Sequence, residues 1–439
     1  MKKFNLAKYI LPSVLSMVMV GTYTNIDGLF IGNRAGDDGL AAINMAWPIV
    51  AFITSVGTGL GIGASVAING LRGKNEYDKA ENTKFTALML LLIAGVLSTA
   101  FCLLAYSPLL KITGAKGAVY DYASDYSVFV SLGALFQVAG AGLTVLLRNE
   151  GKTCLAMIYT AIGLAVHVAL DFLVVEKFAL YGVAASTVAA QLVVAALSLA
   201  SYLACTRKSA KTSEDEKRVG KNPFNLPDVK SVLKNSVAPF GLNFAPSAVL
   251  LFTNYFAMKA GGASAVGAYA VMSYVLYTYD YVFQGVCDGV QPVLSFYEGA
   301  NCAEGKRHTA RTAIMTLCVL SAVFILLTPA AAEFLPKVFA VSASAESALR
   351  SGFIIYAFAY PLKAAIKFIC AYFYSVGKVG VSNVVTYLDP LLFTPLSLAL
   401  LSVNGVRGVW LALPISQVAT LLAATVLIVF TKLDKKVGR

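Results

Sequence analysis

Three ionisable residues in the first half of the chain have types and spacing suited to binding a proton or a small cation. Asp27, His167 and Asp171 all lie within stretches that are otherwise apolar. His167 precedes Asp171 by four residues, so a helix places both side chains on one face. A carboxyl group buried at low dielectric can bind and release a proton near neutral pH or hold a cation, and an imidazole titrates in the same range. We expect these side chains to form one cluster if their helices are neighbours.

Structural explanations for the same residues stay open. Asp27 could cap or kink the end of its helix or lie at an interface, and His167 could be a satisfied histidine of the core. Asp125 and Asp389 lie near the expected ends of their helices, where both could face water. Charged residues inside membrane helices are costly and are functional by default, which favours a functional role for the cluster.

A second set of charged and aromatic residues lies in the second half. Asp280 and Asp288 are eight residues apart, roughly on one helix face, and Tyr277 belongs to the aromatic run beside them. Acids next to aromatic rings suit an organic cation, although tyrosines near membrane ends are also interfacial anchors. Lys363 and Lys367, one turn apart, could contact an anionic substrate or pair with these acids across a cleft, and pairing is the simpler interpretation.

The elements that carry these residues must cross a membrane. The 439-residue chain is 58% hydrophobic and 13% charged, with a mean hydropathy of +0.72, whereas soluble domains carry about 25% charged residues. Apolar stretches of about 20 residues match the ~30 Å hydrocarbon core of a bilayer as helices. We expect an all-α integral membrane protein with twelve transmembrane helices and no large soluble domain. The expected spans are 9–31, 41–67, 86–106, 120–145, 155–175, 181–204, 231–258, 266–294, 310–333, 347–374, 381–402 and 408–431.

The distribution of basic residues predicts the orientation. With the N-terminus inside, the inner segments hold 25 Lys and Arg residues and the outer segments hold eight. Basic residues concentrate on the cytoplasmic side, so we expect both termini in the cytoplasm of a multi-pass protein of a bacterial cell (plasma) membrane. The same bias explains the net charge of +12 without a nucleic-acid partner. The seven scattered cysteines lack the close pairs of a disulfide framework or zinc site and are interpreted as reduced core residues.

The chain contains an internal repeat. Sliding its halves by 226 residues superimposes six glycine pairs, where chance predicts about one. Since each half has six spans, the copies share one orientation and are related by an axis along the membrane normal, which suits alternating access around a central cleft. The expected organisation is an N-lobe (1–204), a cytoplasmic linker (205–230), a C-lobe (231–431) and a cytoplasmic tail (432–439).

The acidic cluster has no counterpart in the second half of the repeat. At an offset of 226, its positions are occupied by Thr253, Phe393 and Ser397. A packing requirement common to both halves would not need acids in one copy alone. The asymmetry therefore favours a function that belongs to the first lobe.

Several short motifs are spread along the whole chain. They are residues 25–32 (NIDGLFIG) with 39–42 (GLAA), 147–152 (LRNEGK), 167–171 (HVALD), 181–187 (YGVAAST) with Gln191, and 408–412 (GVWLA) with Pro414. Together they resemble the multidrug and toxic compound extrusion (MATE) family of secondary transporters. The resemblance implies a two-lobe, twelve-helix fold and export driven by a proton or sodium gradient. In prokaryotic members with a cation site in the first lobe, the matching positions are Asp27, His167, Asp171 and Thr187.

The sequence departs from the family pattern in ways that bear on the coupling ion. His167 stands where the family usually carries Asn. Sodium prefers oxygen ligands, so an imidazole here favours proton coupling, with sodium at Asp27 and Asp171 as the alternative. The seventh span has no acid and the tenth carries Lys instead of the Asp of another branch, which argues against a cation site in the second lobe.

The main hypothesis is a cation-coupled antiporter that exports amphipathic, cationic small molecules or drugs. The alternative is a flippase or exporter of lipid-linked or anionic substrates that uses the Lys363 and Lys367 side of the cleft. The Asp-pair, Ser/His and His-rich metal motifs of membrane enzymes are absent from the sequence, and so is the filter-like loop of a channel. We expect no enzyme activity, no cofactor besides the coupling ion, no resident metal, and a monomer whose partners are its substrate and the bilayer.

Overall fold

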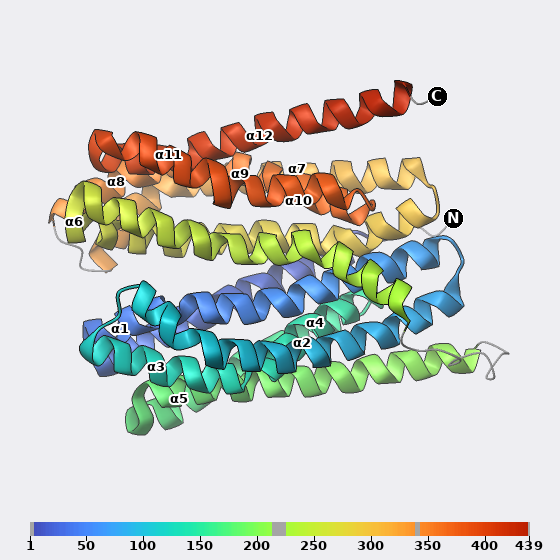
Figure 1. Ribbon diagram of the computed structural model, residues 1–439, viewed down its shortest axis with the longest axis horizontal. Coiled ribbons are helices and arrows are strands. Elements are labelled where there is room, and N and C mark those ends of the chain that lie inside the picture. The colour runs from blue at the N-terminus through green and yellow to red at the C-terminus, as the bar shows by residue number, and fades with distance from the viewer. Residues whose placement is uncertain (1–3, 213–224, 339–342, 438–439) are drawn as a thin grey trace.

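The protein is a bundle of long helices (Figure 1). The computed structural model describes residues 4–212, 225–338 and 343–437, and all regular structure within these ranges is helical. The elements are α1 (Ala7–Gly73), α2 (Tyr77–Ile112), α3 (Gly117–Leu132), α4 (Ala134–Asn149), α5 (Thr153–Thr212), α6 (Leu226–Gly299), α7 (Ala303–Val338), α8 (Ala343–Ala357), α9 (Ala359–Ser375), α10 (Val379–Leu388), η1 (Asp389–Phe393), α11 (Thr394–Leu401), η2 (Ser402–Asn404) and α12 (Gly405–Val437).

The twelve expected spans map onto these helices in order. Three long helices, α1, α5 and α6, each contain two expected spans, so the loops expected between those spans are helical instead. A straight helix of 67 residues would be about 100 Å long, so α1 cannot cross a bilayer only once. In α6 the reversal occurs at Gly262, which has a φ of 64°. By length and composition alone, seven of the described helices could cross a membrane, or up to nine when two bent helix pairs are counted as single spans.

The termini lie at one end of the molecule, as an even number of spans requires (Figure 1). The helices also expose large apolar side chains, including those of Leu104, Leu326 and Phe172, which are 80%, 78% and 71% exposed. Apolar side chains facing outward are the surface that a helix presents to lipid. The protein is therefore a multi-pass membrane protein.

Matching irregularities in the two halves confirm the internal repeat. The expected fourth span bends by 58° at Gly133, between α3 and α4, and the tenth bends by 47° at Phe358, between α8 and α9 and within one residue of the equivalent position. Asn75 and Asn301, 226 residues apart, have φ values of 63° and 51°, and Gly151 and Gly377 have values of 74° and 73°. Positive φ is uncommon away from glycine, so these coincidences identify equivalent turns.

The lobes meet where small residues let helices approach closely. A methyl group added at Gly59 would lie 3.1 Å from Cα of Phe240, and one added at Gly285 would lie 2.5 Å from Cα of Val14. Gly59 and Gly285 are 226 residues apart, and so are Val14 and Phe240. The two contacts are therefore equivalent in the repeat. Each joins the second span of one lobe to the first span of the other.

Ser65 and Gln291 locate the symmetry axis. They are equivalent positions in the repeat, and the Ser65 hydroxyl lies 2.8 Å from Oε1 of Gln291. A residue that touches its own equivalent lies beside the two-fold axis. Further along the same helices, a methyl group on Gly73 would clash with the carbonyl oxygen of Phe296. The lobes are thus in close contact at the end of the molecule that holds the C-termini of α1 and α6.

The segments expected between and after the lobes are partly helical in the structure. Helix α5 continues to Thr212 and α6 begins at Leu226, so the expected linker (205–230) is largely helical at both ends, while residues 213–224 lie outside the described residues. The side chain of Asn225 caps α6 by accepting a hydrogen bond of 2.9 Å from the backbone N–H of Asp228. Helix α12 runs through most of the expected tail (432–439), and residues 438–439 are not described.

Candidate functional site

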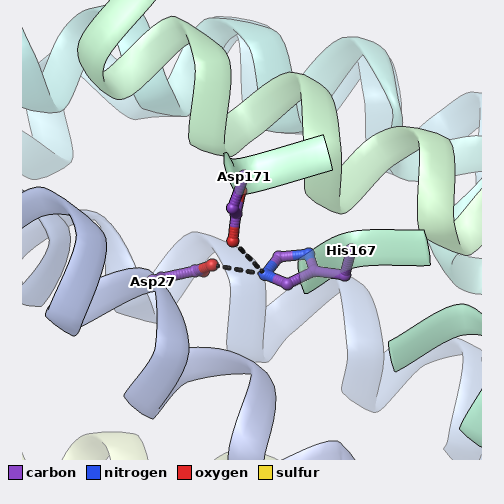
Figure 2. Close-up of side chains that lie close together, drawn as sticks. All are labelled: Asp27, His167 and Asp171. Carbon is purple, nitrogen blue, oxygen red and sulfur yellow. Dashed lines mark hydrogen bonds and ion pairs between the residues drawn. The ribbon is translucent and has the colours of Figure 1, made fainter. Parts of the chain in front are cut away.

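Asp27, His167 and Asp171 form one buried cluster (Figure 2). Helix α5 supplies His167 and Asp171 from successive turns, and the first half of α1 supplies Asp27. Nε2 of His167 lies 2.7 Å from Oδ1 of Asp27 and 3.1 Å from Oδ2 of Asp171. None of the three residues is more than 4% exposed. The predicted contact between the first and fifth spans is confirmed, and because α1 continues well past Asp27, a helix cap is the wrong explanation for that residue.

The cluster has unmet hydrogen-bonding capacity. A single imidazole nitrogen faces both carboxylates, and within the described part of the chain Nδ1 of His167 and Oδ1 of Asp171 have no hydrogen-bond partner, while Oδ2 of Asp171 has only its contact with His167. One ligand atom from each residue lies within 4.8 Å of the other two. Two buried carboxylates are costly unless positive charge balances them. A protonated imidazole balances the charge of one carboxylate. The remaining negative charge can be balanced by one more proton or by a monovalent cation.

Tyrosine and threonine side chains surround the cluster. Tyr126 of α3 donates a hydrogen bond of 3.5 Å to Oδ2 of Asp27, and the edge of Tyr23 packs on the His167 ring with centroids 4.9 Å apart. Thr187 donates to a backbone carbonyl one turn earlier and interacts with Tyr126 rather than with the acids. Thr187 therefore contacts Tyr126, which in turn contacts Asp27, and does not itself bind the carboxylates. The four-residue spacing of Tyr23 and Asp27 could have identified Tyr23, whereas no spacing links Tyr126 to Asp27.

A cavity between the lobes opens beside the cluster. It encloses about 1320 Å³ of empty space, part of it continuous with solvent. Asp27 lines it, whereas His167 and Asp171 lie behind Asp27 and do not. The polar and aromatic side chains that line it include Tyr23, Asp27, Trp47, Tyr126, Gln137, Thr144, Arg148, Thr187, Gln191, Asn243, Tyr277, Asp280, Tyr281, Gln284 and Lys367.

The second set of sequence candidates is divided between this cavity and its surroundings. Tyr277, Asp280 and Lys367 line the cavity. Lys363 lines a neighbouring, smaller pocket of about 430 Å³, which also contacts Tyr277 and Asp280. Asp288 is buried beneath the cavity and does not line it. The tyrosine run is therefore more than an interfacial anchor, since Tyr277 faces the interior.

These charges form a network that reaches across the lobes. Nζ of Lys367 lies 2.9 Å from Oδ2 of Asp280 and donates a hydrogen bond of 3.0 Å to Oε1 of Gln284. Gln284 donates a bond of 2.7 Å to Oδ1 of Asp288. The other Asp288 oxygen lies 3.5 Å from a guanidinium nitrogen of Arg148, which belongs to the N-lobe. The expected pairing of Lys367 with an acid is confirmed, and Gln284 and Arg148 are additions that the sequence did not indicate.

The two acids expected near span ends differ from each other. Asp125 is partly exposed and accepts a hydrogen bond of 2.7 Å from Tyr181. Asp389 is only 4% exposed, so the expectation that it faces water is wrong. It begins the π-helix η1, where Oδ1 accepts a hydrogen bond of 3.2 Å from Thr394.

Comparisons with known proteins agree with the geometry. A family model described as MatE matches residues 12–173 and 241–398, one match in each half. The multidrug export protein MepA of Staphylococcus saprophyticus is 24% identical over 313 residues, covering 71% of this chain and 68% of MepA. The FAD transporter of Shewanella oneidensis is 26% identical over 428 residues, covering 93% of this chain and 90% of that protein.

Solved structures share the fold. A multidrug resistance MATE family transporter in an outward-facing conformation has a TM-score of 0.83 at 22% identity, covering 98% of this chain and 96% of that one. A MOP superfamily transporter from Pyrococcus furiosus has the same TM-score and identity, covering 95% and 93% of the two chains. Because the family model covers most of both lobes, and because the helices follow the same two-lobe arrangement, the chain belongs to the MatE family of MATE transporters.

Proposed function

We propose that the protein is a proton-coupled antiporter that exports amphipathic small molecules by alternating access. The observation that carries the proposal is the buried cluster of Asp27, His167 and Asp171, of which only Asp27 lines the cavity between the lobes. Water in the cavity reaches Asp27 first, and His167 connects it to Asp171. A proton taken up at Asp27 can therefore be shared with the interior of the lobe, where it neutralises buried charge.

The ligand set favours a proton over sodium. Nε2 of His167 occupies the space between the two carboxylates, at 2.7 Å from Asp27 and 3.1 Å from Asp171. A sodium ion at that position would have to displace the ring or accept a nitrogen ligand, and hard cations prefer oxygen. Sodium held by Asp27 and Asp171 is the alternative.

The cavity suits an amphipathic substrate. Aromatic side chains such as Trp47 and Tyr277 line it together with the acids Asp27 and Asp280, a combination that binds organic cations. The relative MepA is a multidrug export protein, which supports drug-like substrates. The other relative is named for FAD, a phosphate-bearing molecule, so anionic or lipid-linked substrates that use Lys367 are the alternative. Lys363 lies outside the main cavity and contributes less to that alternative.

The orientation belongs to the same proposal. The lobes are in close contact at the end that holds both termini, and the excess of basic residues suggests that this end is cytoplasmic. The cavity then opens away from the cytoplasm in this conformation. Export requires the lobes to separate at the terminal end so that substrate enters from the cytoplasm.

Efflux of ethidium and norfloxacin from cells tests this function. Wild type, Asp27→Asn and Asp171→Asn are compared, with the proton and sodium gradients collapsed separately. We expect wild-type efflux to survive loss of sodium, to stop with a protonophore, and to fall at least tenfold in either variant, since buried charge-relay groups act together. Asp125→Asn, which removes a partly exposed acid outside the cluster, is the matched control and should export normally. Normal efflux by the cluster variants would refute the site, and sodium-dependent efflux would refute the coupling ion.

A further inference from the structure

Arg148 is a buried cation at the cavity for which the proposed proton cycle provides no role. Arg148 lies beyond the expected fourth span (120–145), but α4 extends to Asn149, so Arg148 belongs to the last helical turn. It is only 3% exposed, yet it lines the cavity. Thr144 and Gln137 line the same cavity from earlier turns of α4. One face of α4 therefore lines the cavity, and Arg148 is the last residue on that face.

The guanidinium group of Arg148 has few partners. Its contact among the described residues is the ion pair with Asp288, and at 3.5 Å this is longer than a charge-assisted hydrogen bond, which is about 2.7–2.9 Å. Gln284 holds the other Asp288 oxygen at 2.7 Å. A guanidinium carries five N–H donors in a planar fork. None of its nitrogens is among the fully buried side-chain atoms that lack a partner, so the donors that Asp288 leaves unused are accessible from the cavity that Arg148 lines.

The other charged groups of the cavity are balanced differently. Lys367 is fully engaged, with Asp280 at 2.9 Å and Gln284 at 3.0 Å. Asp27 and Asp280 present carboxylates to the cavity. The cavity thus offers the negative charge of Asp27 on the N-lobe, whereas Asp280 on the C-lobe is paired with Lys367. Arg148 is the cation there with the most unused hydrogen-bond donors, since its partner among the described residues is Asp288 alone. A molecule that carries both charges would match this arrangement better than a simple cation.

We propose that Arg148 forms an anion-binding subsite that takes a carboxylate or phosphate group of the transported molecule. The inference rests on the proposed function and deepens it, because it assigns zwitterionic or anionic amphiphiles to the same cavity. The substrate anion accepts the hydrogen bonds that Asp288 leaves unmade, and aromatic side chains such as Tyr277 contact its apolar part. Since Arg148 and Asp288 belong to different lobes, an anion that draws the guanidinium away from Asp288 also weakens a contact that holds the lobes together.

Transport of matched probe pairs tests the subsite. The first pair is norfloxacin and its methyl ester, which differ in a carboxylate, and the second is flavin mononucleotide and riboflavin, which differ in a phosphate. Ethidium has no anionic group and serves as the reference. Each probe is measured in everted vesicles with wild type and with Arg148→Gln combined with Asp288→Asn, since removing both charges avoids stranding a buried carboxylate.

We expect wild type to prefer the anionic member of at least one pair, and the double variant to lose that preference by about tenfold, as expected for a charged hydrogen bond. The pair that responds distinguishes a carboxylate from a phosphate. Arg148→Lys keeps the positive charge but loses the planar set of guanidinium donors. It should show a preference for the anionic probe between those of wild type and the double variant. It also provides a second test if the double variant fails to fold.

Two results would overturn the subsite. In the first, transport of ethidium and of both members of each pair falls by the same factor in the variants. Arg148 would then only hold the lobes together and would bind no substrate anion. In the second, ethidium is exported by wild type but the preference within each pair is the same in all proteins. If wild type moves none of the five probes, the proposed function itself fails, and the subsite fails with it.

Discussion

An imidazole held between two carboxylates gives the first lobe a site with two charge states. With His167 protonated and both acids ionised, the cluster carries one net negative charge, and one further proton makes it neutral. The negative state is costly inside a membrane protein, so it suits a conformation in which Asp27 is hydrated by the cavity. The neutral state suits closure of the lobes around a dry site. Under the proposed function, proton binding at these residues would thereby change which conformation is favoured.

Replacing the imidazole by an amide tests its role. His167→Asn restores the residue type that the family usually carries and supplies an oxygen ligand between Asp27 and Asp171. We expect proton-driven efflux to fall at least tenfold and sodium to stimulate what remains, since oxygen ligands suit sodium. Efflux is measured in vesicles with either an imposed sodium gradient or an imposed proton gradient. His308→Asn changes the only other histidine in the chain and is the control. Unaltered proton-driven efflux in His167→Asn would show that the imidazole of His167 has a packing role and no part in proton coupling.

Residue spacing predicted part of this site. His167 and Asp171 are four residues apart, and Asp27 and Asp171 each lie four residues before the expected end of their span. Their meeting was therefore expected if the first and fifth spans are neighbours. Tyr126 and Arg148 could not be found this way, because each is brought in by a helix whose rotation about its own axis depends on packing. For Asp280 and Lys367 the sequence suggested the pairing but could not show that both face the cavity.

The crossing of α1 and α6 is the element that holds the lobes together at the terminal end. Gly59 and Gly285 make the same close contact in the two halves, against Phe240 and Val14. Without side chains at these glycines, the helix backbones can approach until they touch, as small residues allow in membrane helices. The repeat in the sequence therefore has a physical origin, because each lobe needs the same small residue at its contact with the other.

Adding one methyl group at this crossing tests the contact. In Gly285→Ala the new Cβ would lie 2.5 Å from Cα of Val14, so the helices must move apart. We expect the free energy of unfolding to fall by about 1–3 kcal/mol, the usual cost of overpacking, seen as a lower melting temperature in detergent. Gly380→Ala is the matched control, because nothing lies within 4 Å of a methyl group there. Equal melting temperatures for the two variants would contradict the close contact.

Hydropathy predicted where the helices lie better than where they begin, end or bend. The twelve apolar stretches are all helical, but the expected loops inside α1, α5 and α6 are helical too, because nothing in a short polar segment forbids helix. The bends at Gly133 and between α8 and α9 fall within long apolar stretches, so hydropathy alone gave no sign of them. At Asp389 the sequence suggested a water-exposed span end, whereas Pro390 follows it within a π-helix that keeps the acid buried.

At the scale of the whole molecule, a symmetric scaffold carries asymmetric chemistry. The two lobes share their bends, their turns and their glycine contacts, which is the symmetry that the proposed alternating access requires. The cluster of Asp27, His167 and Asp171 belongs to the N-lobe alone, and the Asp280, Gln284 and Lys367 network belongs to the C-lobe. Under the proposed function, the shared cavity between them would let a proton bound on one side influence a substrate that touches both lobes.

If the lobes rock, a covalent link across the axis must stop transport. In a variant with the native cysteines replaced, Ser65→Cys with Gln291→Cys joins the lobes at side chains that lie 2.8 Å apart. We expect a short thiol-reactive cross-linker to abolish efflux, and a reductant to restore it when the linker contains a disulfide. Ser65→Cys with Asn149→Cys places a similar link, at side chains 2.9 Å apart, inside the N-lobe. That control should keep its efflux, since rocking moves each lobe as a unit. Full efflux with the cross-axis link in place would mean that substrate passes without separation of the lobes at this end.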